Sequence, residues 1–209
     1  ALFSVERAGE SIRYYDNADE FGDQMNRGSS VITLFKDLEI VSDISNDEGT
    51  VVLDLNGHTL TQDADISFKV PDNSALTIKN GTLRFSDESY GYVSYDGILH
   101  MENVTVSRDA SSEVPVFALN GKLYLKDCTF TSEIYVGGFM SVENSTLASL
   151  QLDLGAKGAF YSGTIGELRY EEYESVPTLF DLLAENTALY VENATSETLA
   201  ALVDKTAFA

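Results

Sequence analysis

Several residue types are scarce in this chain of 209 residues, and each scarcity excludes a class of protein. The single cysteine, Cys128, cannot form an internal disulfide framework. Only 13 Lys and Arg stand against 34 Asp and Glu, which gives a formal net charge of −21. Because phosphate contacts need clustered cations, this charge argues against nucleic-acid partners and against anionic membrane surfaces. No apolar run approaches the ~20 residues of a membrane-spanning helix, so we expect no direct membrane insertion.

The chain nevertheless contains enough apolar material for a folded core. Hydrophobic residues make up 44% of it and aromatic residues 11%, whereas disordered chains lack the apolar surface that offsets ordering entropy. The length suits a single domain. We therefore expect one folded domain over residues 1–209.

A short box recurs along most of the sequence. It reads apolar, any residue, apolar, a variable residue, Asn or Asp, any residue, Thr and apolar, and its copies are residues 53–60, 76–83, 99–106, 123–130, 140–147, 162–165 and 189–195. The first six threonines stand at positions 59, 82, 105, 129, 146 and 164. A variable step of this size is typical of repeats that differ in the length of their loops.

Each box predicts a strand, a corner and a second short strand. The period of two places apolar residues on one face and Asp54, Thr77, His100, Tyr124 and Ser141 on the other. Asn and Asp tolerate left-handed backbone better than any residue except Gly, so the corners fall at the acidic or amide residue of each box. These structural corner residues are Asn56, Asn80, Asn103, Asp127 and Asn144.

The residue before the corner alternates in charge. It is Lys79, Glu102, Lys126 and Glu143 in four consecutive boxes, so stacked repeats would bring opposite charges together. In this alignment the first box lacks the charged residue and has one extra residue after its corner.

With a further strand before each box, the repeat contains about three strands in 17 to 24 residues. This pattern predicts an all-β fold, a parallel β-helix solenoid of about seven coils over residues 31–195. An antiparallel sandwich is the alternative, because Asp96-Gly97 and Asn120-Gly121 are good hairpin turns. The recurring corner favours the β-helix.

Helical caps are expected at both ends of the solenoid, since exposed coil ends invite aggregation. The N-terminal cap covers about residues 14–28, with Ala18, Phe21 and Met25 at helical spacing. Residues 177–185, which begin with Pro177, and residues 197–204 form the expected C-terminal helical segments.

The first two boxes also resemble a known family. Residues 53–60 (LDLNGHTL) followed by 75–83 (ALTIKNGTL) are similar to the pectate-lyase-type right-handed β-helix domains of large bacterial cell-surface proteins, common in gut Firmicutes. Residues 34–40 (LFKDLEI) resemble the opening strand of such domains, and 180–190 (FDLLAENTALY) their ending, with Asn186 in place of the usual Gly. The resemblance implies a right-handed β-helix and an extracellular location, attached to the cell surface through other parts of the parent chain. The same scaffold carries lyases, hydrolases, phage tailspikes and adhesins.

No catalytic group can be assembled from the sequence. The lyases of this fold need an Arg or Lys base beside calcium, and the hydrolases need converging Asp residues on one outward strip. Asp54 and His100 could form a proton-transfer pair through a bound substrate, but two solvated strand residues are the favoured interpretation. Cys128 follows a corner, where a small packed residue is expected.

Acidic loops are the candidate metal ligands. Asp47, Asp63, Asp65 and Asp87 lie in three loops that stacking would bring to one edge, and Ca²⁺ prefers such oxygen ligands. Solvated loop acids explain the same residues, and we favour that interpretation. The only cofactor under consideration is therefore Ca²⁺.

Tyrosines are the best indication of a binding site. Tyr90, Tyr92 and Tyr95 fall within six residues, and Tyr124, Tyr135 and Tyr161 follow in later repeats. If several face outward, they form a flat amphipathic platform that can bind a glycan or a host or cell-surface protein. Packing into the core is the alternative for about half of them.

These observations favour a non-enzymatic extracellular module that acts as an adhesive or glycan-binding unit and a rigid spacer. The alternative on the same scaffold is a carbohydrate-active enzyme, either a polysaccharide lyase or a glycoside hydrolase.

Overall fold

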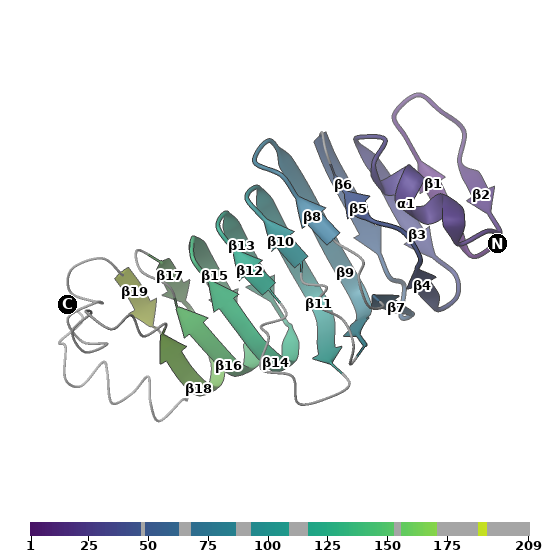
Figure 1. Ribbon diagram of the computed structural model, residues 1–209. Helices are drawn as coiled ribbons and strands as arrows, with labels where there is room; N and C mark the ends of the chain where they lie inside the picture. Colours follow the sequence, from purple (N-terminus) through teal and green to yellow (C-terminus); the bar gives the residue numbers. More distant parts are fainter. Residues whose placement is uncertain are drawn as a thin grey trace.

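The computed structural model describes residues 1–46, 49–62, 68–86, 93–108, 117–152, 156–170 and 188–191. Within these ranges the chain is mostly β-sheet, with one short helix near the N-terminus. The strands lie side by side along the molecule, from β1 beside the N-terminus to β19 (Figure 1). The fold is therefore all-β, as the composition and periodicity predict.

The strands form three stacks, in which each strand pairs in parallel with the equivalent strand of the next repeat. The first stack contains β3 (Ser30–Leu34), β6 (Gly49–Asp54), β9 (Ser74–Phe85), β11 (Ile98–Arg108), β13 (Lys122–Lys126), β15 (Phe139–Glu143), β17 (Lys157–Phe160) and β19 (Ala188–Val191). Only the N-terminal halves of the long strands β9 and β11 belong to this stack.

The second stack follows the corner of each box. It contains β4 (Leu38–Ile40), β7 (Thr59–Gln62), the C-terminal halves of β9 and β11, and the first residues of β14 (Thr129–Val136), β16 (Ser145–Leu152) and β18 (Gly163–Tyr170). The six box threonines are register neighbours in this stack, from Thr59 to Thr164.

The third stack completes the repeat. It contains β5 (Ile44–Ser45), β8 (Phe68–Val70), β10 (Val93–Tyr95), β12 (Phe117–Leu119) and the C-terminal parts of β14, β16 and β18. Every strand pairing in the described ranges is parallel except the two made by β1. The antiparallel sandwich is therefore wrong for these strands.

Left-handed backbone marks the corner between the first and second stacks. Among the described residues, those with positive φ other than Gly are Asn56, Asn80, Asn103, Asp127 and Asn144, with φ between 46° and 60°. Two pairs of these residues are joined by side-chain hydrogen bonds across the repeats. Asn103 Nδ2 donates to Asn80 Oδ1 (3.3 Å), and Asn144 Nδ2 donates to Asp127 Oδ1. Each bond holds two successive corners in line.

The register of the first repeat differs from the one that the sequence predicts. Asp54 is paired with Lys79, and Val52 is paired with Thr77. Asp54 therefore occupies the charged column, and the extra residue of this repeat is Leu55, just before the corner. Leu55 is fully buried over Gly81, where an added Cβ would lie 2.5 Å from Leu55 Cβ. Because Gly81 has no side chain, Leu55 can pack directly over it.

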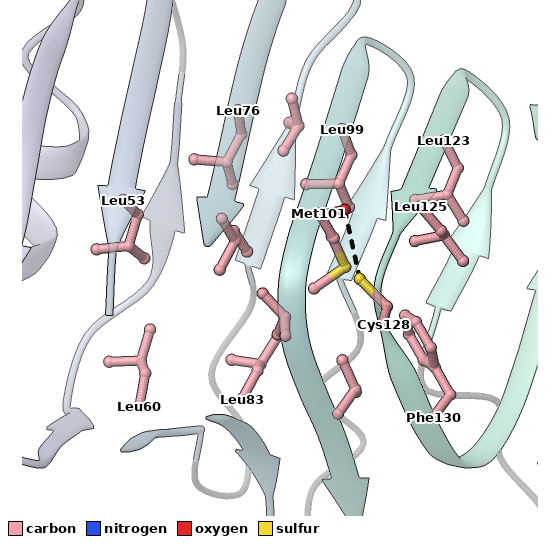
Figure 2. Packing of buried hydrophobic residues seen from close by; sticks show 14 of the residues in the cluster. Leu53, Leu60, Leu76, Leu83, Leu99, Met101, Leu123, Leu125, Cys128 and Phe130 are labelled. Carbon is pink, nitrogen blue, oxygen red and sulfur yellow. Dashed lines mark hydrogen bonds between the residues drawn. The ribbon is translucent and has the colours of Figure 1, made fainter. Parts of the chain in front are cut away.

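The core lies between the three stacks and consists of columns of register neighbours. Leu76, Leu99, Leu123 and Met140 form one such column in the first stack, and all are fully buried. Another column in the second stack begins at Leu38 and continues through Leu60 and Leu83 to Phe130, the last three of which are labelled in Figure 2. Burying an aliphatic side chain contributes roughly 1.5–3 kcal/mol, so each column stabilises the contact between successive repeats.

A hairpin and a helix cover the N-terminal end. The strand β1 (Phe3–Glu6) pairs antiparallel with both β3 and β2 (Arg13–Tyr15), a hairpin that the repeat does not predict. The helix α1 (Asp19–Met25) lies within the segment expected to form the cap, and its buried face includes Phe21 and Met25. Phe21 contacts the β1 residue Phe3 edge-on, with ring centroids 5.4 Å apart.

A side-chain clamp joins the hairpin to the helix. Arg7, which follows β1, donates to Gln24 Oε1 (3.1 Å) and to the Gln24 carbonyl oxygen (3.0 Å). The predicted C-terminal helical segments, residues 177–185 and 197–204, lie outside the described residues. Within the described ranges, no helix is long and apolar enough to cross a bilayer.

Candidate functional site

A groove of about 380 Å³ lies on the outer side of the first stack. Its floor contains the outward residues of four successive strands, namely Thr77 on β9, His100 on β11, Tyr124 on β13 and Ser141 on β15. Tyr161, which follows β17 and is 50% exposed, lines it as well. The remaining lining residues are Met101, Glu102, Leu125, Lys126 and Glu143. The period of two along each strand, combined with the parallel register, builds this site.

Two aromatic rings stack in the groove. His100 and Tyr124 are register neighbours, and their ring centroids are 4.6 Å apart with an interplanar angle of 10°. Tyr124 also contacts Phe139 of β15, at 5.8 Å and a tilted angle. The next residue in the floor, Ser141, is much smaller than these rings. The groove therefore has an aromatic part beside a small polar part.

A column of alternating charge borders the floor. Glu102, Lys126 and Glu143 are consecutive register neighbours and line the groove. The same column begins at Asp54 and Lys79, whose side chains form an ion pair of 3.4 Å. The sequence predicts this alternation as a means of aligning repeats. It does not indicate that the column forms a wall of a groove.

Burial lowers the pKa of His100 below its ordinary value of 6.5. Tyr124 stacks on one face of the ring, and the burial of the imidazole penalises its protonated form. At neutral pH the imidazole is therefore uncharged. It offers the groove one hydrogen-bond donor and one acceptor.

The predicted tyrosine platform divides between two stacks. Tyr124 and Tyr161 line the groove, whereas Tyr135 and Tyr95 are on strands of the third stack. Tyr95 is in register with Val70 and Leu119, away from the column of Tyr124. Tyr90 and Tyr92 lie outside the described residues. Tyr135 does not line the groove, and a platform that includes Tyr90 and Tyr92 stays a prediction.

The candidate calcium ligands Asp47, Asp63, Asp65 and Asp87 all lie outside the described residues. Among the residues that are described, no group of three or more His, Cys, Asp or Glu side chains is arranged to hold a metal ion.

Asp54 does not share a column with His100, contrary to the expected outward strip. The column of His100 continues through Thr77 to Val52. The Asp54 carboxylate accepts hydrogen bonds from the Asn56 amide (3.0 Å) and Asn80 Nδ2 (3.1 Å), besides its ion pair with Lys79. Its role is structural, at the first corner.

Sequence reasoning did not identify Phe139 as a neighbour of the site. Phe139 stands two residues before Ser141 on β15, so the period of two alone places it on the same outer face. A pattern of tyrosines does not include a phenylalanine.

Cys128 belongs to the core, as its position after a corner predicts. It is 2% exposed, and its thiol donates to the carbonyl oxygens of Met101 (3.3 Å) and Lys126 (3.2 Å), the first of which is drawn in Figure 2. Burial raises the pKa of this thiol, so the reactive thiolate is disfavoured.

Comparison of the chain with protein-family models, with curated proteins and with solved structures found no match.

Proposed function

We propose that this chain is a non-enzymatic, extracellular module that binds glycans through the groove of His100 and Tyr124. The observation that carries the proposal is the stacked pair of rings beside small polar residues in an open groove. Sugar rings have apolar faces that pack on aromatic side chains and hydroxyls that bond to polar ones. The groove offers both kinds of contact.

The scaffold that we propose for this module is a right-handed parallel β-helix of about seven coils with capped ends. Three stacks of parallel strands, each joined to the next repeat after 17 to 24 residues, support it. Right-handedness follows the general preference of parallel crossover connections. Such a scaffold would also act as a rigid spacer in a cell-surface protein.

The order of the charged groups along the groove supports binding in preference to catalysis. Its carboxylates, Glu102 and Glu143, are separated in register by Lys126. The wall therefore presents alternating charges to an occupant, and not two adjacent carboxylates. This arrangement suits recognition.

The test is binding of the purified chain to a broad glycan panel, with and without millimolar calcium, while the glycans are monitored for cleavage. We expect binding without shortened products and loss of that binding in Tyr124→Ala. Tyr14→Ala is the matched control, because Tyr14 is likewise stacked on an aromatic ring, that of Phe35, but lies 65% exposed at the N-terminal hairpin.

Two results would overturn the proposal. Glycan binding that persists in Tyr124→Ala would remove the groove as the site. Shortened products that disappear when the groove is altered would show that the protein is an enzyme, either a polysaccharide lyase or a glycoside hydrolase.

A further inference from the structure

The groove is built across strands, which sets the direction of its occupant. Thr77, His100, Tyr124 and Ser141 come from four consecutive strands of the first stack, and each is the register neighbour of the next. At a strand spacing of ~4.8 Å, the three steps between them cover roughly 14 Å. An occupant that contacts all four therefore lies along the stack, perpendicular to the strands.

The functional group on the groove floor changes from one strand to the next along this direction. A hydroxyl (Thr77) is followed by an imidazole, a phenol ring and a second hydroxyl (Ser141). A polymer that repeats at about the strand spacing would present the same unit to each of these side chains in turn. Extended chains of β-linked hexoses advance by nearly this distance for each sugar, and they alternate apolar ring faces with hydroxyl edges.

Charge narrows the class of polymer. The charged wall carries two carboxylates, Glu102 and Glu143, against one ammonium group, Lys126, which is register neighbour to both. The chain as a whole has a formal charge of −21. Both the local and the long-range field therefore oppose a polyanion such as a chain of uronic acids.

We infer that the groove binds an uncharged, linear, β-linked polysaccharide lying along the first stack, with about one sugar for each strand from β9 to β15. The inference rests on the proposed function and adds the class and the direction of the ligand. It predicts a dependence on chain length that a site for a single terminal sugar would not have.

The experiment is calorimetric titration of the full chain with β-1,4-linked oligomers of glucose, mannose and N-acetylglucosamine, from two to six sugars. For at least one series, we expect Kd to fall by about tenfold or more between two and four sugars and to change little beyond. Oligogalacturonates of equal length carry one carboxylate on each sugar, and we expect them not to bind.

Filling the small polar part of the groove with a larger side chain tests the position of the ligand. Ser141→Phe places a ring where the small floor residue lies, and we expect it to weaken binding of the four-sugar oligomer at least tenfold. Thr105→Phe is the matched control, because Thr105 is exposed on the second stack, outside the groove. Unfolding by urea checks that both variants are folded.

Failure of this inference can be told apart from failure of the proposed function. Affinity that is independent of length, or tighter binding of oligogalacturonate that Tyr124→Ala abolishes, would overturn the ligand class and leave the groove as a glycan site. Binding that neither Tyr124→Ala nor Ser141→Phe weakens would overturn both.

Discussion

Folding opposes the protonation of His100 in the groove. Its ring is stacked on Tyr124, and burial lowers its pKa below 6.5. Between the lowered pKa and 6.5 the unfolded chain binds more protons than the folded one, so the stability due to neutral His100 is complete above pH 6.5 and declines as the pH falls. We expect an NMR titration of the imidazole to give a pKa below 6.5.

Replacing the stacked ring gives the control. Tyr124→Ala removes the shield, so the pKa of His100 should rise towards 6.5 in that variant. His58, the other histidine of the chain, lies at the first corner, with Nδ1 3.6 Å from Asp37 Oδ1, so the two imidazole signals are assigned separately. A titration of His100 that is unchanged by Tyr124→Ala would contradict the assignment of the shift to this stack.

The sequence predicts best the features that depend on single residues. The corners followed from the tolerance of Asn and Asp for left-handed backbone, which is a local property and needs no knowledge of packing. The groove could not be predicted from single residues in the same way. Tyr124 could be named from its type, but its partnership with His100 depends on the register between β11 and β13.

At the level of strands, Gly81 is a position where the packing leaves no room for a side chain. An added Cβ would lie 2.5 Å from the His58 carbonyl oxygen and 2.5 Å from Leu55 Cβ, and a backbone carbonyl cannot turn away as a side chain can. We expect Gly81→Ala to lower the free energy of unfolding by about 1–3 kcal/mol, measured by urea denaturation.

The neighbouring Thr82→Ala is the control for this substitution. Thr82 lies on the same strand and is part of the outward threonine column, so its truncation should cost about 0.5 kcal/mol or less. Equal stability of the two variants would show that the extra Leu55 does not restrict Gly81.

The same region shows why the register of the first repeat could not be predicted. Residues 53–56 match the box if the charged residue is missing, and residues 51–56 match it if Leu55 is inserted; both alignments preserve the apolar alternation. Pairing of Asp54 with Lys79 decides between them, and this is a contact between repeats. The hairpin of β1 and β2 was missed for a similar reason, because its strands have four and three residues and do not repeat.

Over the whole molecule, the formal charge of −21 predicts a stability that rises with salt. Like charges repel most strongly in the compact state, and ions screen them within a Debye length of ~10 Å at 0.1 M and ~3 Å at 1 M. We expect the thermal midpoint to rise between low salt and about 0.5 M NaCl, by roughly 2–4 °C for each kcal/mol of repulsion removed in a chain of this size. Calcium chloride at equal ionic strength separates screening from site binding. An equal rise would assign the effect to screening, whereas a larger rise that saturates would indicate a calcium site, for which Asp47 and Asp63 are the predicted ligands. A midpoint that stays constant or falls with NaCl would mean that the acidic side chains are too far apart, or too well paired, for their repulsion to oppose folding.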